Sequence, residues 1–146
     1  MRVLQRIINI TFAFWAGFVS AISFMEAWLK FRAPGVTPEI GLGIGKLVFT
    51  ALNRVEVFLF IGICILILIR SRKNAFILGT QNILFGLAGL ILMVQTFWLV
   101  PALIQRAEMI IAGIEPPESQ LHMLFVLLEP IKVSILIYLA LKYRSK

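Results

Sequence analysis

The sequence predicts an all-α fold, a bundle of four transmembrane helices that makes up a single domain over residues 1–146. Of the 146 residues, 60% are apolar and 14% are charged, whereas soluble domains average about 45–50% apolar and about 25% charged residues. The apolar residues also gather in runs that reach or exceed the length of about 20 residues that a helix needs to cross a bilayer. Both observations indicate an integral membrane protein.

Short segments rich in proline, glycine or charge separate the predicted helices. We expect helices at about residues 7–31, 38–69, 75–112 and 119–142. The second and third are longer than a bilayer requires, since 32 residues of α-helix span about 48 Å. Pro101 is able to kink or end the third helix, because proline removes a backbone donor and crowds the preceding turn.

Basic residues predict which ends of the helices face the cytoplasm. Eight bases flank the two chain termini and the turn between the second and third helices, with no acid among them: Arg2, Arg6, Arg70, Arg72, Lys73, Lys142, Arg144 and Lys146. Cytoplasmic loops of membrane proteins carry such an excess of lysine and arginine. We therefore expect both the N and C termini to be cytoplasmic, in a multi-pass protein of a bacterial inner (plasma) membrane.

Several functional classes are disfavoured by the same pattern. The net charge of +7 sits at helix ends rather than in a stripe with interleaved aromatic residues, so nucleic acid is not an expected partner. The glycine-rich string Gly41–Lys46 has neither the strand nor the Ser or Thr of a phosphate-binding loop. Cys64 is the single cysteine and is expected to be an inert, packed thiol. Expected partners are the lipid bilayer and either a larger membrane complex or further copies of the chain, and the sequence does not identify a cofactor.

Ionisable residues within the spans form the candidate site, because charges inside a membrane are costly and need partners. The candidate polar cluster consists of Glu26, Lys30, Lys46, Asn53, Arg54, Glu56, His122, Glu129 and Lys132. Steps of three, four and seven residues place most of them on one face of each helix. Counting from the cytoplasmic boundary, Lys132 lies about 15 Å deep, and Glu129 and Glu56 about 20 Å deep. Gln95, Gln105 and Arg106 of the third helix could close the cluster.

This cluster has more than one interpretation. Pairing of Glu56 with Lys132, or of Glu129 with Arg54, would only fix the register of the helices. The deep set, however, carries about one surplus positive charge, which an anionic ligand entering from the outer side would neutralise. A metal site built from Glu26, His122 and Glu129 is conceivable. No pattern of nucleophile and base is present, so no catalytic residue is assigned.

Two family resemblances involve these residues. The segments Pro101–Arg106 and Ser119–Glu129 resemble the second half of small four-helix membrane proteins of the TMEM205-like (DUF4149) group, in which a proline near the end of helix three precedes a His-led helix four. That group is linked loosely to metal or drug resistance. The string Asn53–Glu56 is similar to the Asn-x-x-Glu motif of the MAPEG family, which implies a glutathione-dependent membrane enzyme.

Three functions follow as expectations. The first is a non-enzymatic membrane protein, either an accessory subunit or a binder of an anionic or lipid-like ligand in an outer-side polar cavity. The second is a MAPEG-like enzyme. The third is a proton-coupled transporter or carrier that uses Glu56, Glu129 and Lys132, although the uncharged run 57–69 argues against a polar path on the inner side.

Overall fold

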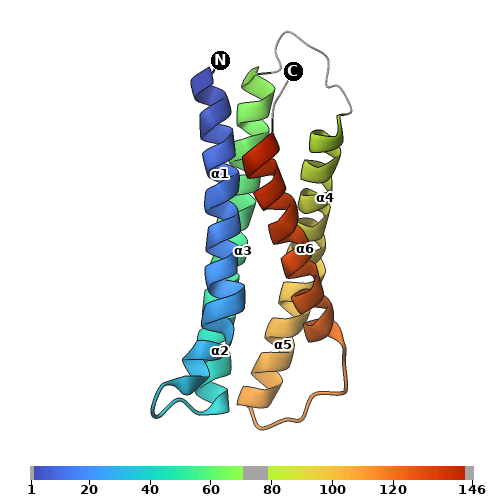
Figure 1. Cartoon of the computed structure of the whole chain (residues 1–146). Helices are drawn as coiled ribbons and strands as arrows, with labels where there is room; N and C mark the ends of the chain where they lie inside the picture. Colours follow the sequence, from blue (N-terminus) through green and yellow to red (C-terminus); the bar gives the residue numbers. More distant parts are fainter. Residues whose placement is uncertain (1, 71–78, 144–146) are drawn as a thin grey trace.

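The structure is a computed structural model that describes residues 2–70 and 79–143. Its helical segments join end to end into four long rods (Figure 1). The first rod consists of α1 (Arg2–Ser20), the π-helical turn η1 (Ala21–Glu26), α2 (Ala27–Leu29) and the 3-10 turn η2 (Lys30–Arg32), and the second rod is α3 (Pro38–Arg70). The third consists of α4 (Thr80–Val94), the π-helical turn η3 (Gln95–Leu99) and α5 (Val100–Ile111), and the fourth is α6 (Leu121–Lys142).

All four rods in the described residues are long and apolar enough to cross a membrane. They run over Val3–Arg32, Pro38–Ile69, Thr80–Ile111 and Leu121–Lys142. The prediction of an all-α fold with four such helices is therefore confirmed. The fourth helix starts two residues later than expected, and there the hydroxyl of Ser119 accepts a hydrogen bond from the Leu121 N–H. Residues 75–78, where the third helix was expected to start, lie outside the described residues.

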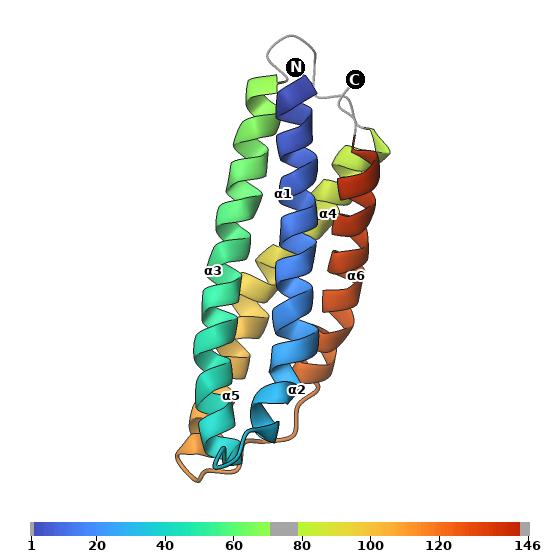
Figure 2. The ribbon, with the colours of Figure 1, turned by 60° about the vertical axis from the view of Figure 1, so that its left-hand side comes forward.

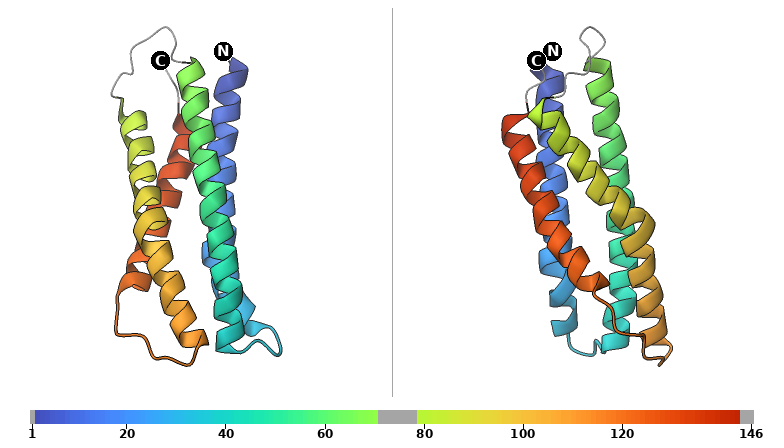
Figure 3. Two further views of the ribbon diagram at one scale, coloured as in Figure 1. Left: turned by 180° about the vertical axis from the view of Figure 1, so that it is seen from behind. Right: turned by 90° about the vertical axis from the view of Figure 1, so that its right-hand side faces the viewer.

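Pro101 does not end the third rod, which continues to Ile111. The π-helical turn Gln95–Leu99 comes immediately before it. In a π-helical turn each backbone N–H bonds to the carbonyl five residues earlier instead of four. Such turns are common where an extra residue or a proline interrupts a long helix. The rod changes direction in this region (Figure 3). The expected break is thus a bend, because the wide turn accommodates the proline.

The two chain termini lie at the same end of the bundle, and the loops 33–37 and 112–120 lie at the opposite end (Figure 2). This arrangement agrees with the four predicted helices, since an even number of crossings returns the chain to the side where it began. Arg6 and Lys142 belong to the end with the termini. The predicted basic residues Arg72, Lys73, Arg144 and Lys146 lie outside the described residues. We call the two ends of the bundle the terminal end and the loop end.

The main hydrophobic core fills the terminal half of the bundle. Phe12, Phe85 and Tyr143 are buried there, with the ring of Phe12 5.6 Å from that of Phe85 and 5.5 Å from that of Tyr143. A smaller second core of Leu99, Val100 and Phe125 lies toward the loop end. Many large apolar side chains remain exposed on the outer faces of the rods, and lipid tails would cover them.

The rods differ in length, and this difference shapes the loop end. The first three span 30 to 32 residues, whereas α6 spans 22. At about 1.5 Å per residue, α6 is about 15 Å shorter than the second and third rods. At the terminal end α6 stops short of α1 and α3, and at the loop end α3 and α5 extend beyond its first turn (Figure 1). The first turns of α6, with His122 and Phe125, still face the interior near the loop end.

Candidate functional site

A network of buried polar side chains links all four rods near the middle of α6. Lys132 is fully buried, and Glu56, Gln95 and Glu129 are each no more than 2% exposed. The Lys132 ammonium lies 2.6 Å from Oε1 of Glu56 and 3.0 Å from Oε1 of Glu129. It also donates a 2.7 Å hydrogen bond to the side-chain oxygen of Gln95. We call these four residues, with Trp15, the buried network.

Hydrogen bonds fix the remaining members of the buried network. Gln95 donates from Nε2 to Oε1 of Glu129 over 2.7 Å, and the indole N–H of Trp15 donates to Oε1 of Glu56 over 2.8 Å. Trp15 is completely buried and its ring meets that of Phe60 edge-on at 6.4 Å. In an apolar interior such bonds are needed, since an unpaired buried polar group costs about 1–3 kcal/mol. The network therefore ties α1, α3, η3 and α6 into one register.

The other predicted site residues lie nearer the loop end or on the outer surface. Glu26 and Lys30 pair with each other across 3.2 Å. Lys46 pairs with Glu108 of α5, a residue that the sequence did not single out. Asn53 donates to the hydroxyl of Thr96 over 2.9 Å. Arg54 is exposed on the outer face of α3, so it does not reach Glu129.

The deep charges therefore differ from those expected. The sequence predicted a surplus of one positive charge, with Arg54 inside. The structure buries two carboxyl groups, those of Glu56 and Glu129, against the single ammonium of Lys132. Two residues along a helix are separated by about 200°, so Arg54 and Glu56 cannot share an inward face.

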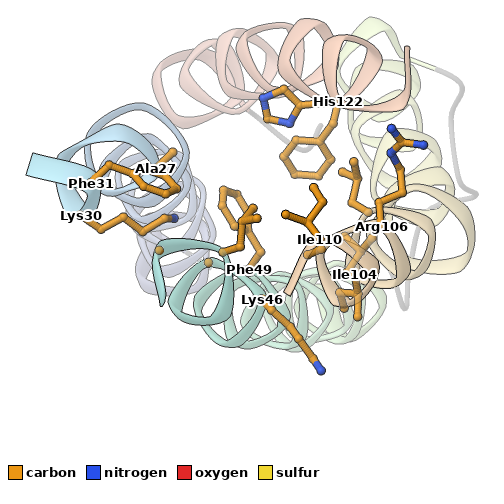
Figure 4. A pocket seen from close by; sticks show the side chains of 16 residues that line it. Ala27, Lys30, Phe31, Lys46, Phe49, Ile104, Arg106, Ile110 and His122 are labelled. Atoms are coloured by element: carbon orange, nitrogen blue, oxygen red, sulfur yellow. The ribbon is translucent and has the colours of Figure 1, made fainter. Parts of the chain in front are cut away.

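A cavity of about 360 Å³ lies toward the loop end, between the first rod, α3, α5 and the start of α6 (Figure 4). Its wall is almost entirely apolar and includes Phe49 of α3, Ile104 and Ile110 of α5, and Phe125 of α6. The rings of Phe49 and Phe125 meet edge-on at 5.7 Å. Because Phe125 precedes Glu129 by one helical turn, about 6 Å along the axis, this aromatic pair separates the cavity from the buried network.

Basic side chains surround this apolar cavity. Lys30, Lys46, Arg106 and His122 all line it. Lys30 points inward, and its ammonium lies 5.4 Å from the centre of the Phe49 ring, whereas the ammonium of Lys46 points away (Figure 4). Arg106 donates to the backbone carbonyl of Pro117 over 2.6 Å and has no carboxylate partner among the described residues. Since Lys30 and Lys46 are paired with Glu26 and Glu108, Arg106 contributes the positive charge of the rim that no described carboxylate balances, while the wall is apolar.

Glycines on α3 make room for the first rod beside the cavity. A Cβ at Gly41 would lie 2.1 Å from the ring of Phe31, and a Cβ at Gly45 would lie 3.0 Å from the ammonium of Lys30. This explains the Gly41 and Gly45 pair, whose spacing is typical of closely packed membrane helices.

The described residues offer no group of three metal-ligating side chains. In particular, the structure does not bring Glu26, His122 and Glu129 together, since Glu26 pairs with Lys30, Glu129 is buried in the network, and His122 is exposed at the cavity. Cys64 is a free, half-buried thiol.

Sequence reasoning located Glu56, Glu129 and Lys132 through the cost of charge in an apolar helix, and it named Gln95 as a group that could close the cluster. It missed Trp15, since a tryptophan inside an apolar run resembles any other core residue. The cavity that the sequence predicted on the outer side was expected to be polar, whereas the wall of the cavity in the structure is almost entirely apolar.

The fold and the site define a four-helix bundle of the membrane type, with a buried ion network below an apolar cavity that has a cationic rim. Comparisons with family models, with curated proteins and with solved structures find no match for the chain.

Proposed function

We propose that the chain is a non-enzymatic multi-pass membrane protein that binds an amphiphile with an anionic head group, such as a fatty acid or a lysolipid, in the cavity at the loop end. The observation that carries this proposal is the cavity itself, which combines a wall of Phe49, Ile104, Ile110 and Phe125 with a rim that holds Arg106. Ligand sites commonly have volumes of about 300–1,000 Å³ with a few placed polar groups. The volume and lining fall within that description.

The charges favour an anionic head group over a neutral one. Lys30 and Lys46 already have carboxylate partners in Glu26 and Glu108. Arg106 bonds only to a neutral carbonyl, so its charge remains available. A guanidinium presents several N–H donors in a plane that matches a carboxylate or a phosphate. Arg106 is therefore the group expected to hold the head, with the tail against the apolar wall.

The position of the cavity supports entry from the membrane. If α6 spans the hydrocarbon layer, whose thickness is about 30 Å, the cavity lies at the level where head groups meet acyl chains. With the terminal end in the cytoplasm of a bacterial inner membrane, this is the outer leaflet. A fluorescent protein fused to the C-terminus would then fluoresce, whereas an exported alkaline phosphatase fused there would stay inactive.

Filling the cavity tests the proposed function. Ala107 lines the cavity, whereas Ala51 is exposed on the outer face of α3. Ala107→Phe should reduce binding of the fluorescent fatty acid cis-parinarate to the purified protein by about tenfold or more, a change of about 1.4 kcal/mol. The matched Ala51→Phe should leave binding unchanged. Equal binding by both variants and the wild type would refute the proposal, and stabilisation by glutathione instead would favour the MAPEG-like enzyme.

A further inference from the structure

The buried network contains more acid than base. Glu56 and Glu129 contribute two carboxyl groups and Lys132 contributes one ammonium, and all three side chains are no more than 3% exposed. The other rods add no charge here, since α1 presents Trp15 and η3 presents Gln95. If both carboxyl groups were ionised, an uncompensated negative charge would be buried, which costs several kcal/mol per ion.

Hydrogen-bond donors are also too few for two carboxylates. The ammonium of Lys132 has three N–H groups, and these are directed to Glu56, Glu129 and Gln95. Oε2 of Glu129 is buried and has no hydrogen-bond partner. A bare carboxylate oxygen in that position would be strongly unfavourable, whereas a neutral carboxyl group in an apolar setting costs far less.

We infer that the buried network is a proton-binding site: the pair Glu56 and Glu129 holds one proton in addition to those of the Lys132 ammonium. With this proton the three groups carry one positive and one negative charge, so the network is neutral. This inference concerns a different site from the amphiphile cavity and does not depend on it.

The pair Glu26 and Lys30 provides a contrast within the same chain. It contains one carboxylate and one ammonium 3.2 Å apart, so its charges already balance. Oε1 of Glu26 is buried without a partner as well. If a missing partner alone caused protonation, Glu26 would also hold a proton. The charge count predicts that it does not, which makes Glu26→Gln a matched control.

Infrared spectroscopy of the full chain in dodecyl maltoside, a detergent without ester carbonyls, tests the inference, because the C=O stretch of a protonated carboxyl group is separate from carboxylate bands and shifts in D₂O. At about pH 8, where solvent-exposed carboxyl groups are ionised, the wild type should show this band. Either Glu56→Gln or Glu129→Gln alone should abolish it, since each leaves one acid beside one lysine. Glu26→Gln should retain it.

Removal of Lys132 should strengthen the infrared band, whereas removal of either glutamate should abolish it. Lys132→Met leaves two carboxyl groups without a cation, so both should hold a proton and the band should about double. The wild-type spectrum decides the matter even if a variant fails to fold. Absence of the band in the wild type, its loss in Glu26→Gln, or its survival in both Glu56→Gln and Glu129→Gln would overturn the inference.

Discussion

Nζ of Lys132 lies 2.6 Å from Oε1 of Glu56, so a single ion pair joins α6 to α3 in a fully buried position. The same ammonium also contacts Glu129 on its own helix. The network thus ties the rotation of α6 to that of α3. We therefore expect the stability of the bundle to depend on the side chains of Lys132, Glu56 and Glu129.

Replacement of Lys132 by Met should destabilise the bundle strongly. Removing one partner of a buried ion pair costs about 3–5 kcal/mol, because the remaining charge or its neutralisation is not compensated. Unfolding in mild detergent under a denaturant gradient would measure this loss. The triple variant Glu56→Gln, Glu129→Gln, Lys132→Met should recover most of it. A single Lys132→Met variant as stable as the wild type would show that the pair contributes nothing.

Replacement of Trp15 by Phe should cost about 1–3 kcal/mol, because it removes the indole donor to Glu56 and leaves a buried acceptor short of one bond. Trp28 offers the control, since it is exposed and its indole donates to the Phe24 carbonyl of its own helix. Thermal unfolding of the two variants should differ clearly. Similar losses for Trp15→Phe and Trp28→Phe would argue against the bond to Glu56.

Gly89 should not tolerate a side chain. A Cβ there would lie 2.6 Å from Cε2 of Phe60, whose ring is packed 5.0 Å from that of Phe85. Gly89→Ala is expected to cost about 1–3 kcal/mol through overpacking. Gly86 on the same helix has nothing within 4 Å, so Gly86→Ala should be neutral or slightly stabilising, as alanine favours helix. The sign of the difference in unfolding free energy checks the packing of α4 on α3.

Arg106 should discriminate between head groups. Arg106→Gln is expected to weaken binding of a fatty acid anion by about tenfold, the loss of one charge-assisted contact of about 1.5 kcal/mol. Binding of a neutral monoacylglycerol should change little. Arg54→Gln removes an exposed arginine outside the cavity and should affect neither ligand. Equal effects of the two substitutions would indicate a nonspecific response to charge.

Much of the fold could be predicted from the sequence. Polar side chains are costly in lipid, so helices that cross a membrane consist of long apolar runs that are easily recognised. The four spans and the buried positions of Glu56, Glu129 and Lys132 follow from that pattern. The outward direction of Arg54 was accessible too, since it is two residues from Glu56 and so lies on another face.

Other features depend on how the helices meet. The bond between Trp15 and Glu56 requires the particular alignment of α1 with α3, and no local pattern encodes it. The pairing of Lys46 with Glu108 joins two helices at a height that the π-helical turn Gln95–Leu99 helps to set. The cavity forms where residues of the first rod, α3, α5 and the start of α6 face one another, an arrangement that only the assembled bundle shows.

Photocrosslinking tests the proposed binding site most directly. A fatty acid with a diazirine on its acyl chain would be equilibrated with the protein in nanodiscs, irradiated, and the labelled residues mapped by mass spectrometry. The proposed function predicts labels concentrated on the cavity wall, at Ile104 and Ile110, that excess unlabelled fatty acid removes. Labels spread over the exposed outer residues Phe58 and Phe97, and unaffected by competition, would contradict it.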